Sequence, residues 1–200
     1  SQATNDMVAI GFQAMHNSNH TDTAGNVAVG YTALRMNIKG AQNVAIGDEA
    51  GRYATGSKNT FTGHRAGKGS DSAPYASGDK NTAFGNDAMR GLTTGYQNVA
   101  IGHRAGENIT TGYSNVYIGG YRTGYYNQTG HSNVGIGAGA INHDTNKPFG
   151  YKFQANSLIT YQLKLIMNLL QILGRKNFFK YELYCFGRRY IIWRDFALSC

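Results

Sequence analysis

The chain has 200 residues, with 27 glycines, 2 prolines and 15% charged residues. Because 41% of the residues are hydrophobic, the composition excludes a wholly disordered chain, and the glycines do not follow a collagen period. Residues 1–150 hold 11 Lys and Arg against 9 Asp and Glu, whereas residues 151–200 hold 8 against 2. The first 150 residues thus lack the basic surface of a nucleic-acid-binding domain, and we expect no nucleic-acid partner.

A short apolar run that ends in glycine recurs eight times between residues 5 and 141. Consecutive closing glycines are 16 to 22 residues apart, so one unit is about 17 residues long. The wider frame reads G-x-x-N-[VT]-A-[IVF]-G-x-x-A, and fixed periodicity of this kind is typical of repeat architectures. The runs are MVAIG (7–11), NVAVG (26–30), NVAIG (43–47), NTFTG (59–63), NTAFG (81–85), NVAIG (98–102), NVYIG (115–119) and NVGIG (133–137).

Each unit is interpreted as a strand, a corner and a second short strand. The two β-branched residues of N-V-A-I-G are two apart, so on a strand they face the same side, which we expect to be the interior. Stacked copies can bury this side, which predicts an all-β parallel β-solenoid of eight coils over residues 1–145. The predicted structural core comprises Val8, Ile10, Val27, Val29, Val44, Ile46, Val99, Ile101, Val116, Ile118, Val134 and Ile136.

Two alternatives to an oligomeric solenoid stay open at this point. A flexible glycine-rich linker is disfavoured, because a linker would not place Val/Ile pairs in one register eight times. A monomeric parallel β-helix is the stronger rival. We favour an oligomer, because the inward residues of each unit are few and small.

The repeat N-[VT]-A-[IF]-G-x-x-A resembles the head repeats of trimeric autotransporter adhesins and the repeats of phage tail fibres. The sequences Thr94–Asn98 (TGYQN) and Thr111–Asn115 (TGYSN) match the tail-fibre form. The resemblance implies a left-handed β-roll and a homotrimer, with Val and Ile inside each roll or at the trimer centre. It also implies an extracellular location, on a virion or a bacterial surface, and a host glycan or protein as partner.

Residues 146–200 carry no trace of the repeat, and they hold both cysteines and the only tryptophan. Apolar residues recur every three or four positions over 157–174, which predicts an amphipathic helix there. This helix could staple the end of the roll as a short coiled coil. A membrane span fits the length, but Lys164 and three amides lie within it, so we expect no membrane association. An out-of-frame extension is the third reading.

No residue pattern indicates catalysis, a cofactor or a metal ion. His64 and His103 occupy equivalent positions of the repeat, and Asp48–Glu49 lies at a corner, so both are interpreted as surface residues. We therefore expect a non-enzyme without cofactors. Tyrosines at corners could contact a receptor or a glycan, or could stack between coils. The candidate contact residues are Tyr113, Tyr117, Tyr121, Tyr125 and Tyr126.

The sequence hypothesis for function is an elongated fibre segment that presents a recognition surface, with a phage tail fibre as the first candidate. A bacterial trimeric surface adhesin is the first alternative. A structural filament subunit and a glycan-cleaving tailspike are further alternatives, of which only the last would turn over a substrate.

Overall fold

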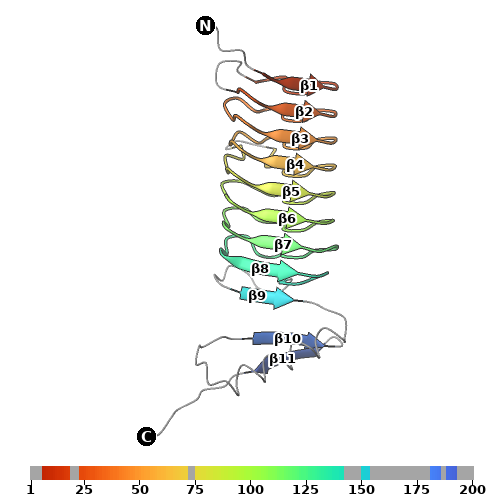
Figure 1. The fold of residues 1–200 in the computed structure, drawn as a ribbon, viewed down its shortest axis with the longest axis vertical. Helices are drawn as coiled ribbons and strands as arrows, with labels where there is room; N and C mark the ends of the chain where they lie inside the picture. The colour runs from red at the N-terminus through yellow and green to blue at the C-terminus, as the bar shows by residue number, and fades with distance from the viewer. Residues whose placement is uncertain are drawn as a thin grey trace, which may run out of the picture.

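The computed structural model describes residues 6–18, 23–71 and 75–141, together with the backbone of three later strands at 150–153, 181–185 and 188–192. Nine parallel strands form one sheet in sequence order, and each of the eight predicted units contributes one of the first eight. The predicted parallel β-solenoid is thus confirmed, with seven turns from the first unit to the eighth (Figure 1). The strands are β1 (Val8–Ile10), β2 (Val27–Val29), β3 (Val44–Ile46), β4 (Thr60–Thr62), β5 (Thr82–Phe84), β6 (Val99–Ile101), β7 (Val116–Ile118), β8 (Asn133–Ile136) and β9 (Gly150–Phe153).

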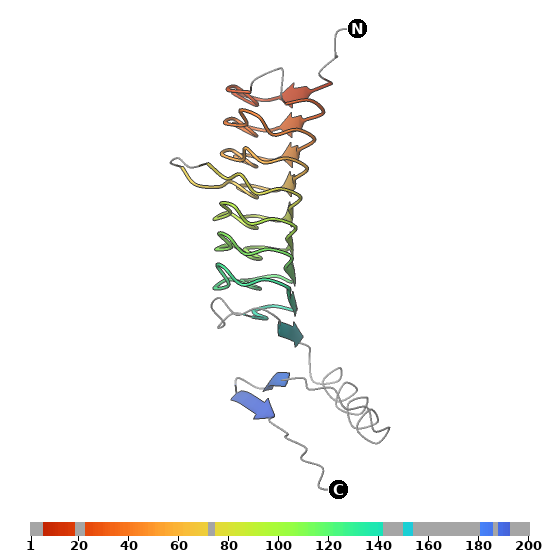
Figure 2. The same ribbon diagram turned by 90° about the vertical axis from the view of Figure 1, so that its left-hand side faces the viewer.

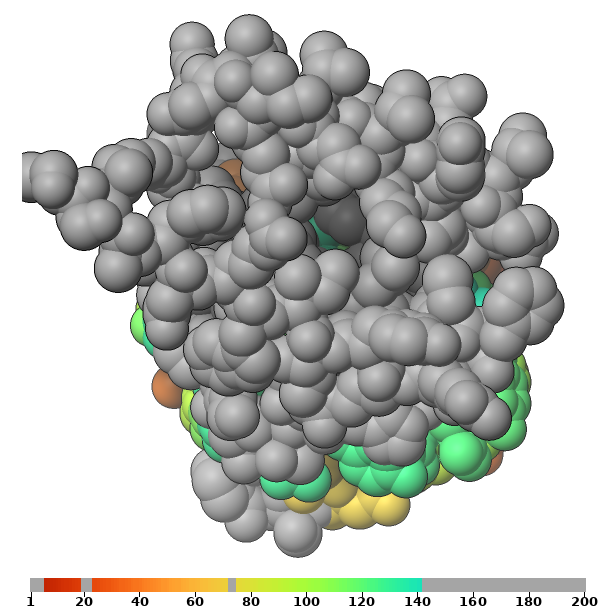
Figure 3. All heavy atoms as spheres, turned by 90° about the horizontal axis from the view of Figure 1, so that it is seen from below, coloured from red at the N-terminus to blue at the C-terminus, as the bar shows by residue number. Residues whose placement is uncertain are grey.

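The coils stack into a column with the sheet along one side. Each turn returns to the sheet beside the previous strand, and the longer segment between β4 and β5 projects from the side of the column (Figure 2). Viewed from below, orange, yellow and green atoms of early, middle and late coils lie close together along the visible rim (Figure 3). β9 extends the sheet into the segment predicted to be non-repetitive. β10 (Tyr181–Cys185) and β11 (Arg188–Ile192) form a separate antiparallel pair. The predicted helix at 157–174 lies outside the described residues.

The Val/Ile pairs lie on the outer face of the sheet, so the prediction that they form the core of each roll is wrong. Residues of the same rank are paired in register from strand to strand, as in Val27↔Val44 and Ala28↔Ala45. In β2 to β7 only the middle residue of each strand is buried, and Ala28 and Ala45 are fully buried. The inward position of β2 to β7 holds Ala in four strands, Phe61 in β4 and Tyr117 in β7. The residues that were predicted to form the core and that lie on the outer face are Val8, Ile10, Val27, Val29, Val44, Ile46, Val99, Ile101, Val116, Ile118, Val134 and Ile136.

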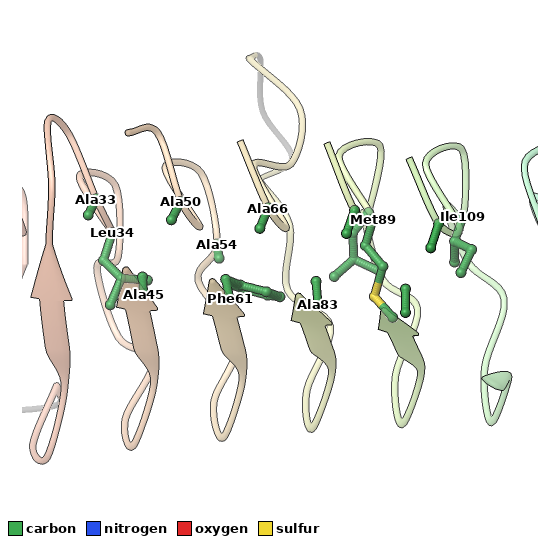
Figure 4. Packing of buried hydrophobic residues seen from close by; sticks show 14 of the residues in the cluster. Ala33, Leu34, Ala45, Ala50, Ala54, Phe61, Ala66, Ala83, Met89 and Ile109 are labelled. Atoms are coloured by element: carbon green, nitrogen blue, oxygen red, sulfur yellow. The ribbon is translucent and has the colours of Figure 1, made fainter. Parts of the chain in front are cut away.

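Large side chains fill the space that small residues leave, either within one coil or from a neighbouring coil (Figure 4). In the coil of Ala28 the residue six positions later is large, Leu34. Gly51 and Gly106 follow Ala45 and Ala100 at the same distance, and a Cβ added to them would meet Phe61 and Leu34, or Ile109 and Tyr117. Where the strand supplies Phe61, the residue six positions later is Gly67, and a Cβ added there would collide with the Phe61 ring. Complementary volumes of this kind give native packing density without a wide core.

The second half of each coil is a series of tight turns, in place of the second short strand expected from the sequence. Non-glycine residues take a left-handed conformation there, with φ of 52° at Thr32 and 49° at Leu34. Such values are unusual for non-glycine residues. They are held by hydrogen bonds within the coil, Arg35 N–H to Thr32 O at 3.2 Å, and between coils, Leu34 N–H to Ala50 O at 3.0 Å.

Buried asparagines form a continuous ladder at the corner that leads into each of the strands β2 to β8, and the last of them is the first residue of β8. The side-chain oxygen of Asn98 accepts a hydrogen bond from the backbone N–H of Asn115 at 3.0 Å, and the Asn98 amide donates to Gly112 O at 2.8 Å. Buried asparagine thus satisfies backbone groups that the corner would leave unpaired. The ladder comprises Asn26, Asn43, Asn59, Asn81, Asn98, Asn115 and Asn133.

Replacing Asn98 by alanine should lower the free energy of unfolding by about 2–4 kcal/mol, because it orphans the buried Asn115 N–H and removes a donor to Gly112 O. Urea titration would measure the change. The exposed Asn86→Ala variant is the control, with an expected change within about 0.5 kcal/mol. Equal losses for the two variants would contradict a structural role for the ladder.

Candidate functional site

The outer sheet face is the first surface that could carry function. We use this name for the outward residues of β1–β8, which form two rows along the column. In the row that ends each strand, six of the eight residues are exposed, from 37% at Ile118 to 60% at Ile10, with Phe84 at 57%, whereas Val29 and Thr62 are half-buried. Parallel sheets in folded proteins are normally covered on both faces, and contiguous apolar patches of this kind mark interaction sites. The rows are Val8, Val27, Val44, Thr60, Thr82, Val99, Val116, Val134 and Ile10, Val29, Ile46, Thr62, Phe84, Ile101, Ile118, Ile136.

The structure separates the five candidate tyrosines into three environments. Tyr117 is the inward residue of β7 and is fully buried, so its prediction as a contact residue is wrong. Tyr113 stacks between Tyr96 and His131, with ring centroids 4.9 and 4.5 Å away, which matches the alternative in which tyrosines stack between coils. Tyr121, Tyr125 and Tyr126 come together in the following corner.

Two of these tyrosines, Tyr121 and Tyr125, flank one guanidinium group, and Tyr126 packs against Tyr125. We call His103, Tyr121, Arg122, Tyr125 and Tyr126 the Arg122 cluster. The Arg122 guanidinium carbon lies 5.1 Å from the Tyr121 ring centroid and 4.7 Å from that of Tyr125. Tyr126 meets Tyr125 edge-on at 4.8 Å, and His103 lies 6.4 Å from Tyr121. Both distances from Arg122 are within cation–π range.

A one-residue insertion creates this corner. Arg122 N–H donates to His103 O at 3.4 Å, as Arg104 N–H donates to Asn86 O at 2.9 Å, so Arg122 has the register of Arg104. The extra residue is Gly120, and a Cβ added to it would have no neighbour within 4 Å. Tyr121 is 59% exposed, much as Phe12 (63%) and Tyr31 (52%) are at the equivalent position of earlier coils. The 11-residue interval from Gly119 to Gly130, one longer than that from Gly102 to Gly112, was the available sequence signal.

A charged ladder runs along the same edge of the column through earlier coils. The almost fully buried carboxylate of Glu107 forms ion pairs with Arg104 (Nε to Oε2, 3.1 Å) and with Arg90 (Nη2 to Oε1, 3.4 Å). Arg65 and Asp87 pair at 2.9 Å. These side chains occupy the second and fifth positions after a closing glycine, a spacing from which the ladder could have been predicted.

Glu49 is the acidic member of the ladder nearest the N-terminus, and it pairs with Arg52 and with Lys68, the latter at 3.2 Å. Burial by itself would raise the pKa of the Glu49 carboxyl. Hydrogen bonds and charge from Lys68 and Arg52 outweigh that cost and hold the pKa below its usual value. The Glu49 carboxyl therefore stays ionised at neutral pH.

Burial raises the pKa of the Tyr117 hydroxyl well above its usual value, against the opposing effect of hydrogen bonds with Asn127 and Asn133. The folded state therefore keeps this tyrosine neutral at a pH where the unfolded chain ionises it. Stability linked to Tyr117 is complete below pH ~10 and is lost as the pH rises from there towards the folded-state pKa.

Between pH 10 and 11 this single group should lower the free energy of unfolding by up to about 1.4 kcal/mol per pH unit. The Tyr117→Phe variant loses the hydrogen bond to Asn127 and should be less stable at pH 8, but its stability should fall less steeply above pH 10. Urea titrations at pH 8, 10 and 11 would compare the slopes. Parallel slopes for the two proteins would contradict the assignment.

Neither metal nor membrane features emerge from the described part of the chain. No group of three or more His, Cys, Asp or Glu side chains there is placed to hold a metal ion. His64 lies 3.8 Å from Asp48 and 3.1 Å from Asn86, and His103 lies against Tyr121, so the two equivalent histidines have different surroundings. Among the described residues there is no helix that is long and apolar enough to span a membrane.

Comparison with known proteins returned no family-model match, no similar curated protein and no similar solved structure.

Proposed function

We propose that the chain is a segment of a homotrimeric fibre that presents a recognition surface to a host cell, as a phage tail fibre does. The outer sheet face carries the proposal. It runs the full length of the eight coils, it is built from Val, Ile, Thr and Phe, and no described residue of the same chain covers it. Copies of the chain packed face to face would bury it, and the number three comes from the resemblance to trimeric fibre repeats.

Assembly through the sheet would leave the rest of each coil on the outside of the fibre. The corners and the charged ladder would face solvent, and the Arg122 cluster would be displayed there. A stiff column that repeats its backbone every ~4.8 Å is suited to holding such a cluster away from its attachment point. The function is therefore passive binding, with no step of covalent chemistry.

Retention of the fluorescently labelled full chain on bacterial cells and on their purified surface polysaccharides tests this function. We expect saturable retention on some members of a broad panel, competed by unlabelled protein. Release of reducing sugar would overturn passive binding in favour of a tailspike hydrolase. Absence of saturable retention across the panel would leave the filament subunit as the better account.

A further inference from the structure

We propose that the Arg122 cluster binds the carboxylate of an acidic sugar. This proposal deepens the recognition function above and rests on it. It assigns the chemical class of the ligand and the residues that bind it. The guanidinium of Arg122 pairs with the sugar carboxylate, and the exposed tyrosine rings contact the apolar face of the sugar.

The first argument is the missing acid in the charged ladder. Arg65 and Arg104 occupy the same ladder position as Arg122, and each pairs with a carboxylate, of Asp87 and of Glu107. In the coil of Arg122 the fifth ladder position is Tyr125, and the next coil has Gly139 at the second position. Within the described residues, no carboxylate forms an ion pair with Arg122.

The neighbouring coils also offer no free carboxylate for Arg122. The sequence contains no Asp or Glu from residue 108 to 141, so no acid of these coils competes for the site. Glu107, the preceding acid, already pairs with Arg90 and Arg104. A ligand carboxylate would therefore restore the pairing that the ladder has in earlier coils.

The second argument is the geometry of the rings. Tyr121 and Tyr125 hold the guanidinium at 5.1 and 4.7 Å from their centroids, which limits its motion before a ligand arrives. A planar guanidinium donates two parallel hydrogen bonds to a carboxylate, a geometry that lysine cannot offer. Stacked Tyr113, by contrast, has its ring faces occupied by Tyr96 and His131.

Exposure supplies the third argument. Tyr121 is 59% exposed, so part of its ring is accessible to a ligand. Tyrosine combines an apolar ring with a polar hydroxyl, which suits the mixed surface of a sugar. The cluster thus offers one charged contact and an aromatic platform beside it.

Binding of defined oligosaccharides to the full chain tests the proposal. The probes are a tetragalacturonate, a glucuronate-containing tetrasaccharide and a sialylated trisaccharide, each compared with its carboxyl-reduced counterpart by calorimetry. We expect at least one acidic probe to bind and its reduced counterpart to bind at least about tenfold more weakly, since a charge-assisted pair is lost. Failure of all three acidic probes, or equal binding of the acidic and reduced forms, would overturn the proposal.

Variants then locate the site. Arg122→Gln should weaken binding of the acidic probe at least about tenfold, and Arg122→Lys should bind between Arg122→Gln and wild type, because lysine keeps the charge without the fork. Arg35→Gln is the matched control: Arg35 is also half-buried and also forms no ion pair with a described carboxylate. Unchanged binding in Arg122→Gln, or an equal loss in Arg35→Gln, would overturn the assignment to this cluster.

The outcome is separable from that of the fibre proposal. The oligomeric state is measured independently of any sugar, and retention on cells could depend on a surface other than this cluster. A trimer that binds cells but no acidic sugar would overturn only the inference made here.

Discussion

The double variant Ile46→Glu/Ile118→Glu should convert the assembled protein into monomers. Both side chains belong to the outer sheet face, at 42% and 37% exposure in the single chain. If copies pack through this face, each assembly would bury six unpaired carboxylates there, and burying a charge without a partner is strongly unfavourable. Ile46 and Ile118 lie in β3 and β7, so the two new charges are not neighbours within one chain.

Sedimentation velocity and circular dichroism would measure this effect together. The spectrum should match wild type, because both side chains already point away from the interior. The control is Gln97→Glu/Thr111→Glu, which adds the same charge at exposed corners of the column and should leave the assembly intact. A folded Ile46→Glu/Ile118→Glu protein that keeps the wild-type mass would show that the face does not carry the interface.

Replacing Phe61 by alanine should lower the free energy of unfolding by about 3–5 kcal/mol. Phe61 is fully buried and fills the space that Gly51 and Gly67 leave open in the coils on either side of its ring. Backbone hydrogen bonds to both neighbouring coils hold this part of the column, so it cannot collapse around the cavity. Urea titration at constant oligomeric state would measure the loss.

The double variant Phe61→Ala/Gly67→Leu should recover most of that stability. It reproduces the pairing of Ala28 with Leu34, and Leu34 has a φ of 49° where Gly67 has 56°, so leucine is already accepted in this backbone conformation. Gly67→Leu alone should be strongly destabilising, because its side chain would collide with Phe61. Additive losses in the double variant would contradict the complementary packing of the coils.

The repeat itself could be predicted from the sequence. Which face of each strand points into the interior could not. Period-two alternation places Val44 and Ile46 on one face, and Asn43 and Ala45 on the other, and the structure confirms this grouping. Hydropathy points to the wrong face as the interior, because it assigns the asparagine side to solvent. The asparagine is buried because its amide satisfies backbone groups at the corner, a requirement that hydropathy does not register.

The tight turns in the second half of each coil could not be predicted from the sequence. Thr32, Glu49 and Arg65 adopt left-handed backbone conformations that their intrinsic preferences disfavour. Hydrogen bonds between coils impose these conformations, and such bonds exist only once the coils are stacked. Local propensity therefore predicts the strand of each unit and misses the turns that follow it.

The candidate site was predicted in part. Five tyrosines are predicted as exposed contact residues, and of these Tyr121 and Tyr126 are exposed. Tyr117 was misassigned, because the middle residue of its strand is the inward one. Arg122 is absent from the predicted contact residues, although its ladder position can be counted from the closing glycine.

The mass of the full-length wild-type assembly in solution tests the central claim most directly. Sedimentation equilibrium at micromolar concentration should give three times the 21.7 kDa of one chain. A mass of 21.7 kDa, with the outer sheet face open to solvent, would contradict assembly through that face.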